Sequence, residues 1–162
     1  MADPDPASID SVMVTPELLD HLATLGCRAV MAMASGDQAT AMHYLGQLPT
    51  QPRVLHAYAS SMGDLMRCTY GDTAHVHAMH RGPDGTVSAR PLDEAPLYLR
   101  TAIRFLLAYM AGDQDAADLQ FRLVLDEGVP GDLGGFIWTV TAQAAQAIPT
   151  IDATLVRQAS LN

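Results

Sequence analysis

The chain has 162 residues, of which 49% are hydrophobic and 17% are charged, and its formal net charge is −9. This length fits one domain with a substantial core, and the apolar content excludes an intrinsically disordered chain. All nine basic residues are arginine, and an acidic protein with scattered arginines repels a phosphate backbone, so we expect no nucleic-acid partner.

Residues 1–14 are acidic and rich in proline, which predicts a flexible tail. A signal peptide has a basic start followed by an apolar stretch, and this segment has neither. The long apolar runs, such as 103–111, are too short to span a bilayer. We therefore expect a cytoplasmic protein without membrane contact.

The first helical hairpin is predicted from its end signals. Thr15, followed by a proline, should cap a helix that reaches about Ser35, with Gly26 inside it as a close helix contact or a break. Gly36 should end this helix in the left-handed conformation. Asp37 should then accept hydrogen bonds from the free amides of the next helix. A third helix follows from the Pro-bounded stretch at 50–52, with an apolar stripe at helical spacing.

The second half of the chain repeats this pattern. The copies share a glycine, an aspartate, a glutamine and an alanine at one offset, and a proline and an aromatic residue at an offset two residues longer. The residues Gly36, Asp37, Gln38, Ala41, Pro52 and Tyr58 match Gly112, Asp113, Gln114, Ala117, Pro130 and Phe136. The sequence therefore predicts a mainly α fold, a helical bundle of two related three-helix units over 15–72 and 93–149, within a single domain 15–162.

Three further features are expected around these units. Asp93, with Pro96 in the first turn, should start the first helix of the second unit, and Asp132 should cap its third helix. A separate C-terminal helix should cover 150–161, with Thr150 as its cap, because Pro149 interrupts the preceding helix.

Residues 73–92 alternate between polar and apolar side chains, which predicts one β-hairpin insertion near 74–90 with its turn at 82–85. Pairing Arg81 with Thr86 would give one small apolar face that rests on the helices. His75 and His77 would lie on the opposite face, where a His-x-His pair can chelate zinc or nickel. A solvated strand, a pH-sensitive contact and a metal site at these histidines all remain open.

The Gly-Asp-x-x-x-Ala turns at 36–41 and 112–117 resemble those of the tetratricopeptide repeat family. The likeness covers about 35 residues in each copy. It departs from the family at Phe105, where a small residue is typical, and in its period near 76 residues instead of 34. The resemblance implies a surface that binds a partner peptide or protein, with no reaction.

We expect the residues on the apolar faces of the predicted helices to be mostly buried. These are Leu22, Val30, Leu45, Tyr58, Met62, Leu106, Tyr109, Phe121, Phe136 and Val140. Cys27 and Cys68 are expected to be reduced, buried thiols, because both lie in apolar helical context.

Three classes of function remain open. The first is a non-enzymatic protein-interaction or scaffold module that self-associates as a homodimer, through the hairpin edges or through the face of Gly134 and Gly135, with Trp138 as an anchor for a partner. The second is a small-ligand or metal-binding protein with a pocket between the two halves. The third is an enzyme with dispersed groups such as His77, Asp72 or Cys68. We prefer the first, with no catalytic residue and no cofactor.

Overall fold

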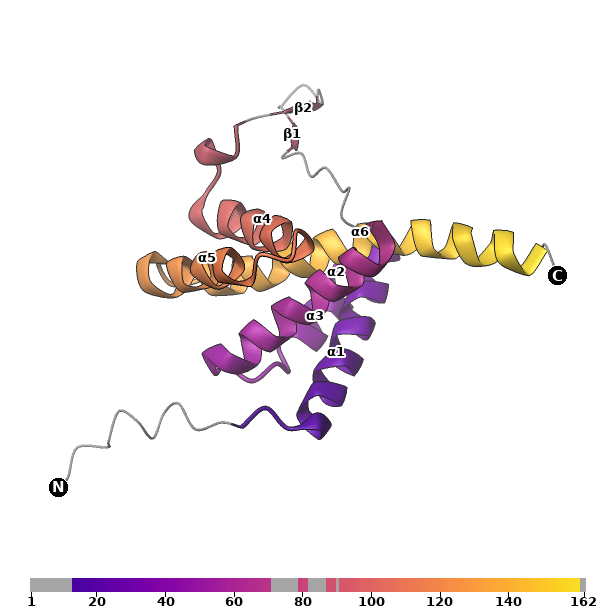
Figure 1. The fold of residues 1–162 in the computed structure, drawn as a ribbon, viewed down its shortest axis with the longest axis horizontal. Helices are drawn as coiled ribbons and strands as arrows, with labels where there is room; N and C mark the ends of the chain where they lie inside the picture. Colours follow the sequence, from indigo (N-terminus) through magenta and orange to yellow (C-terminus); the bar gives the residue numbers. More distant parts are fainter. Residues whose placement is uncertain (1–12, 71–78, 82–86, 90, 161–162) are drawn as a thin grey trace.

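The computed structural model describes residues 13–70, 79–81, 87–89 and 91–160 of the chain (Figure 1). Its described part is mainly helical, which confirms the predicted α class. None of these helices has the length and apolar content of a membrane span. The elements in chain order are α1 Pro16–Ala34, α2 Gln38–Leu45, α3 Pro52–Tyr70, β1 Met79–Arg81, β2 Val87–Ala89, a short 3-10 helix η3 Leu92–Glu94, α4 Leu97–Met110, α5 Gln114–Glu127 and α6 Asp132–Ser160.

The turns between α1 and α2 and between α4 and α5 are built alike, as predicted. Gly36 has a φ of +81° and Gly112 a φ of +78°, the left-handed region that glycine adopts without strain. In each turn the N–H groups of the glycine and the following aspartate donate to carbonyl oxygens three and five residues back, at 2.8–3.0 Å. The carboxylates of Asp37 and Asp113 each accept the backbone N–H three residues ahead, at 3.0 Å.

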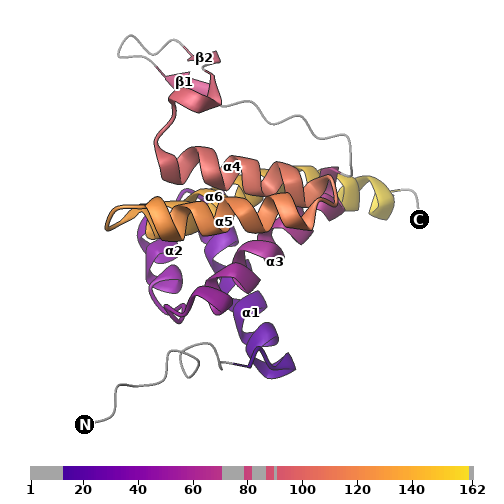
Figure 2. The ribbon, with the colours of Figure 1, turned by 60° about the vertical axis from the view of Figure 1, so that its left-hand side comes forward.

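The two units pack against each other through their third helices, α3 and α6. α3 and α6 pack against one another, and each of them also packs against both α1 and α4 (Figures 1 and 2). α2 and α5 lie outside, each held mainly by its own hairpin partner, α1 or α4. Exchanging the two units leaves this set of contacts unchanged, so the arrangement has an approximate twofold symmetry within one chain.

A buried pair of hydroxyl groups joins α3 to α6. The hydroxyls of Tyr58 and Thr141 lie 2.8 Å apart, and both residues are fully buried. Thr141 also donates its single proton to the carbonyl oxygen of Ile137 at 2.8 Å, so the Tyr58 O–H is the donor to Thr141. This direction leaves neither buried hydroxyl without a partner.

Glycines allow two more close helix contacts. A Cβ atom on Gly26 would lie 2.8 Å from the Cε atom of Met62, so Gly26 marks a close contact between α1 and α3 and not a break. A Cβ atom on Gly63 would lie 2.5 Å from a ring carbon of Tyr109 on α4. The hydroxyl of Tyr109 donates to Asp64 at 2.7 Å, which holds the ring against this glycine.

The predicted core is confirmed. Nine of its members are buried, and Leu45 is partly buried against the core. The alanines of the two turns, Ala41 and Ala117, are fully buried, as close packing of the hairpin helices requires.

The β-hairpin predicted near 74–90 as an insertion resting on the helices is wrong. Only three residues pair in each described strand, and the strands contact mainly each other, apart from the helical body in Figure 1. The register also differs from the expected one by one residue. The observed pairs are Met79 with Ala89, His80 with Ser88 and Arg81 with Val87. The fold is therefore that of a helical protein.

Three helix ends also differ from expectation. α6 continues through Pro149 to Ser160, so there is no separate helix over 150–161. Asp132 is the first residue of α6, and its carboxylate accepts the N–H of Val129 at 3.0 Å, outside the helix. Asp93 lies in η3, and α4 begins only after Pro96.

Replacing Gly63 by Ala should destabilise the protein, by about 1–3 kcal/mol, because the new methyl group would overlap the Tyr109 ring. Gly134→Ala is the matched control, since a Cβ atom there has no neighbour within 4 Å. That variant should gain up to about 1 kcal/mol from helix propensity. Chemical denaturation measures both, and equal effects of the two substitutions would contradict the close contact.

The stability of the protein should fall between pH 10 and pH 12. Burial raises the pKa of Tyr58 from 10.0 to about 12, so the folded state keeps a proton that the unfolded state loses as the pH rises through this range. For Tyr58 this corresponds to roughly 3 kcal/mol of stability. Burial and the hydrogen bond to Asp64 also raise the pKa of Tyr109 to about 12.

Tyr58→Phe should therefore flatten the alkaline part of the stability profile only in part, and Tyr109→Phe should remove a separate portion. Unfolding in denaturant at several pH values, combined with tyrosinate absorbance, measures both effects. A wild-type profile that stays level up to pH 12 would show that neither phenol is protected by the fold.

Candidate binding groove

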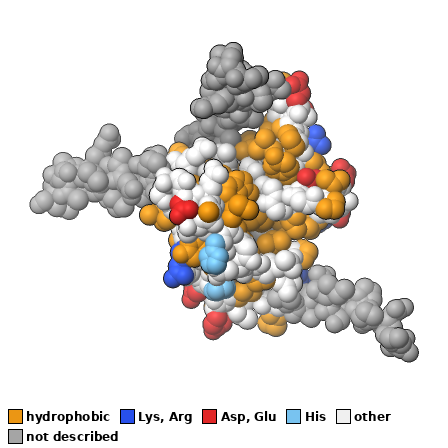
Figure 3. Space-filling model, turned by 180° about the vertical axis from the view of Figure 1, so that it is seen from behind, with side chains coloured by type: hydrophobic (Ala, Val, Ile, Leu, Met, Phe, Trp, Pro, Cys, Tyr) orange, Lys and Arg blue, Asp and Glu red, His pale blue; other side chains and the backbone are white. Residues whose placement is uncertain are grey.

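An open apolar groove of about 830 Å³ runs between α2 and the first half of α6, and we call it the α2–α6 groove. Apolar side chains gather on one face of the helical body in Figure 3. None of the residues that line the groove is charged. They are Gln38, Met42, Leu45, Gly46, Leu48, Thr50, Leu55, Tyr98, Gly131, Leu133, Gly134, Gly135, Ile137 and Trp138.

The groove continues along α6 into a smaller hollow of about 350 Å³. Gln38 and Trp138 line both parts, and the extension ends beside Gln146. From Gly131 to Gln146, α6 rises by about 22 Å at 1.5 Å per residue.

All three residues predicted to contact a partner line this groove, but in different ways. Gly134 is exposed, and the space beside it is open. Gly135 is already used inside the chain, since a Cβ atom there would lie 2.8 Å from the ring of Tyr98 on α4. Trp138 is partly buried and forms the boundary between the groove and its extension. Their role in binding stays a prediction.

The opposite side of the molecule has the equivalent space filled. There the Nε2 atom of His56 on α3 lies 2.7 Å from the Oδ1 atom of Asp118 on α5. The His56 ring meets Phe121 edge-on at 5.1 Å between centroids and Phe105 at 5.9 Å. Phe121 in turn packs on Phe136 at 5.6 Å. Aromatic side chains thus close the gap between α3 and α5.

The two sequence offsets relate this filled side to the groove. By them, Gly134 takes the place of His56, Leu45 that of Phe121 and Met42 that of Asp118. Gly134, Leu45 and Met42 all line the groove, just as their three counterparts contact one another across the filled side. The groove is therefore the counterpart of the filled gap between α3 and α5, and it stays open because its residues are smaller.

Two carboxylates that are next in sequence to groove residues make other contacts. The side chain and backbone of Thr40 donate hydrogen bonds to Asp37, which hold the pKa of Asp37 below its usual value, and Asp37 lines the hollow between α1 and α2. The Asp132 carboxylate accepts the N–H of Val129.

The predicted histidine site lies outside the described residues, since His75 and His77 fall in the segment 71–78, as does Asp72. In the described ranges, no group of three or more His, Cys, Asp or Glu side chains is placed to hold a metal ion. His21 and His43 are exposed on their helices. The structure thus brings together the residues that were predicted to contact a partner and leaves the metal hypothesis without a described site.

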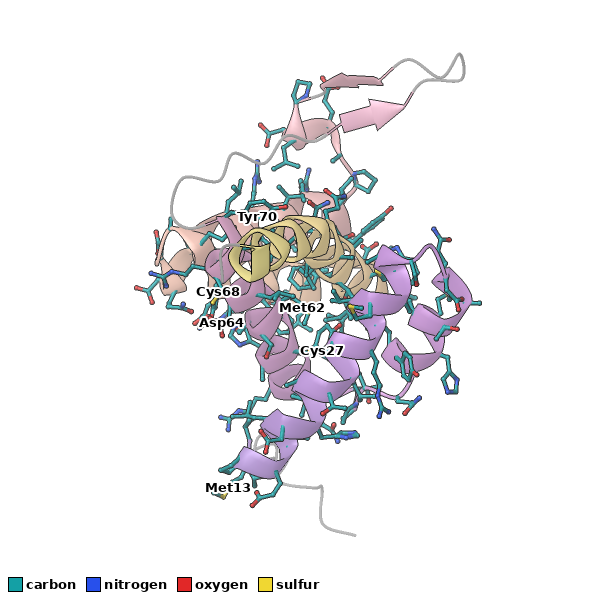
Figure 4. All side chains as sticks on the ribbon, turned by 90° about the vertical axis from the view of Figure 1, so that its right-hand side faces the viewer. Met13, Cys27, Met62, Asp64, Cys68 and Tyr70 are labelled. Carbon is teal, nitrogen blue, oxygen red and sulfur yellow. The ribbon has the colours of Figure 1, made fainter. Side chains whose placement is uncertain are left out.

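The expectation of buried cysteines is wrong. Cys27 on α1 and Cys68 on α3 are both free and exposed (Figure 4). Cys27 lies beside Arg28 in a shallow hollow between α1 and α2, where the Arg28 guanidinium is 5.8 Å from the centre of the Tyr44 ring. Both cysteines belong to the solvent side of helices whose opposite sides are apolar, which the local composition did not reveal.

Sequence reasoning missed the Met42 and Leu45 wall of the groove and the pair of His56 with Asp118. The signal that could have found them is the repeat itself. Aligning the two units matches Gly134 with His56 and Leu45 with Phe121, so two large side chains of one unit correspond to smaller residues in the other at the same site. Comparison with known proteins finds no matching family model, curated protein or solved structure. The functional argument therefore depends on the geometry of the groove.

Both cysteines should react with a small maleimide in the folded protein as fast as they do in denaturant, because their side chains are exposed. Mass spectrometry after brief labelling counts the modified thiols. The variants Cys27→Ser and Cys68→Ser assign them individually. A thiol that reacts only after unfolding would contradict its exposed position.

Proposed function

We propose that the protein is a non-enzymatic interaction module that binds a helical segment of a protein partner in the α2–α6 groove. The observation that carries this proposal is an uncharged, mainly apolar groove of about 830 Å³ at the junction of the two units, left open while its counterpart is filled. Open apolar surfaces of this kind mark sites of interaction in soluble domains.

The shape of the groove favours a helix as the bound element. Its walls are the helices α2 and α6, and with its extension it follows α6 for about 22 Å, the length of about 15 helical residues. An amphipathic helix buries its apolar side in such a groove through residues three and four positions apart. The absence of charge from the lining matches the composition of interface centres.

A second candidate is a small apolar ligand, which the volume of the groove supports. Ligand sites commonly measure about 300–1,000 Å³ and combine an apolar lining with a few polar groups. Here Gln38 and Thr50 are the polar side chains that could orient a ligand. Such a ligand would fill the space between Gly134 and Leu45 and would leave the extension beside Ala142 unused.

The partner class in this proposal is protein, either a different chain or a second copy in a homodimer, in a cytoplasmic setting. No catalytic group takes part. The resemblance of the Gly-Asp turns to tetratricopeptide repeats agrees with peptide binding. The groove itself, however, lies between the units and not within one hairpin.

The test is to fill the groove with the side chains of the filled side, in the double variant Gly134→His, Leu45→Phe. A displayed library of amphipathic 15-residue helical peptides is selected on the folded wild-type protein, and each enriched peptide is then measured against the double variant. We expect peptides that bind the wild-type protein and lose at least tenfold in affinity on the filled variant. The fluorescence of Trp138, the only tryptophan in the chain, should change on binding.

Leu119→Gln is the control, because Leu119 is an exposed apolar residue on α5, outside the groove lining, with 54% of its surface accessible. It should leave peptide binding unchanged. A selection without any peptide that depends on an open groove would overturn the proposed function. Saturable binding of a dodecyl-chain detergent monomer in the same groove, without peptide binding, would favour the small-ligand candidate.

A further inference from the structure

Resting on the proposed function, we infer that the α2–α6 groove is redox-sensitive, because peroxide oxidises the thioether of Met42 in its wall to a sulfoxide that weakens the binding of a partner. Three observations carry this inference. Met42 is exposed, it lines the groove, and the methionines of the core are shielded from solvent.

The methionines of the described helices differ widely in their exposure. Met62, Met66 and Met110 belong to the core, with at most 4% of their surface accessible. Met42 on α2 and Met31 on α1, by contrast, have 64% and 56% of their surface accessible. A soluble oxidant must reach the sulfur atom in order to react with it, so we expect peroxide to modify Met42 and Met31 well before it modifies the core.

The position of Met42 distinguishes it from the other exposed methionines of the described ranges. Met42 lines the α2–α6 groove, whereas Met31 lines the separate hollow between α1 and α2. Met13 is exposed just before α1 and lines neither of them. Met33 lines the extension of the groove but is partly buried. Oxidation of the exposed methionines therefore changes the groove itself through Met42.

The reaction transfers one oxygen atom from hydrogen peroxide to the sulfur of Met42. The O–O bond of the peroxide breaks, an S–O bond forms and water leaves, so the sulfur loses two electrons and the peroxide gains them. The product is a polar sulfoxide in place of a flexible apolar side chain. Methionine sulfoxide reductases reverse this change, which makes it suitable for regulation.

The sulfoxide acts on binding and not on the fold. In the unbound protein Met42 meets water, so its sulfoxide oxygen stays hydrated and the packing of the core is unchanged. A partner that covers the mainly apolar groove would remove water from this oxygen, and burial of a polar group without a hydrogen bond costs free energy. Oxidation of Met42 should therefore weaken the complex while the stability of the free protein stays the same.

The experiment uses the full-length chain with the substitutions Cys27→Ser and Cys68→Ser, because both exposed thiols would otherwise react with peroxide. This parent protein is treated briefly with hydrogen peroxide, which catalase then removes. Mass spectrometry of proteolytic fragments gives the extent of oxidation at each methionine. The probe is a fluorescently labelled, groove-dependent helical peptide from the selection described above, and its anisotropy gives the affinity before and after treatment.

We expect Met42 and Met31 to be oxidised while Met62, Met66 and Met110 are spared. The affinity for the peptide should fall about tenfold, the effect of burying one unpaired polar group. Methionine sulfoxide reductases should restore the affinity, and the unfolding transition of the free protein should not move.

Met42→Leu and Met31→Leu are a matched pair, since each removes one exposed thioether and only the first changes the groove. Each variant is compared with its own untreated form, so that an effect of the substitution on affinity does not enter the ratio. Met42→Leu should abolish the loss of affinity on oxidation, and Met31→Leu should retain it. A loss that persists in Met42→Leu would overturn the inference.

The outcomes separate this inference from the function on which it rests. Peptides that bind the untreated protein, and bind equally well once Met42 is oxidised, would overturn the redox sensitivity and leave the interaction function standing. A library without groove-dependent peptides would overturn the function itself, and with it any regulation of the groove.

Discussion

The crossing of α3 and α6 is the contact on which the other helices depend. Tyr58 and Thr141 meet there as a buried hydroxyl pair, and the cost of removing them from water is offset only while the two helices remain at this distance. α1 and α4 each pack against both crossing helices, and α2 and α5 are held mainly through α1 and α4. A shift of α3 along α6 would therefore disturb every layer, including the separation of α2 from α6 that creates the groove.

A symmetric crossing with unequal side chains explains why only one side of the molecule is open. The backbone leaves equivalent spaces next to α2 and α5, but large side chains fill only the space next to α5. Phe105, Phe121 and His56 fill one space, whereas their counterparts Ala29, Leu45 and Gly134 are smaller. Leaving apolar surface such as Met42 in water forgoes stabilisation that burial would supply. The open side thus lowers stability, as binding sites commonly do.

How far the sequence could predict this structure depended on how far apart in the sequence the interacting residues lie. The turns at Gly36 and Gly112 were predicted correctly, because a left-handed glycine followed by a capping aspartate is a signal within six residues. The buried stripes were also correct, since helical spacing alone selects one face. The exposure of Cys27 and Cys68 was not foreseen, because apolar neighbours in sequence do not lie on the same side of a helix.

The elements that failed share a dependence on distant contacts. Alternation predicted a hairpin over 73–92, but alternation alone supplies no surface for strands to pack on, and the described residues of this segment form only a three-residue pairing. Pro149 was expected to end a helix, yet α6 passes through it. The groove required knowledge of which helices become neighbours across the two units. Sequence could place Gly134 and Trp138 near one another on a helix, but not opposite Met42.

The size of the groove also bears on the kind of binding that it supports. A free helix of about 15 residues is marginal in water, so a partner segment must be ordered as it binds, at a cost of about 2–5 kcal/mol. A contact with only one helix buries a modest area, which places such complexes among the weaker, reversible ones. One deeply seated aromatic side chain then has a large share of the favourable energy, because contacts at the rim contribute little. In this protein the open space lies over Leu45 and beside Gly134, so specificity would depend mainly on the residue that enters it.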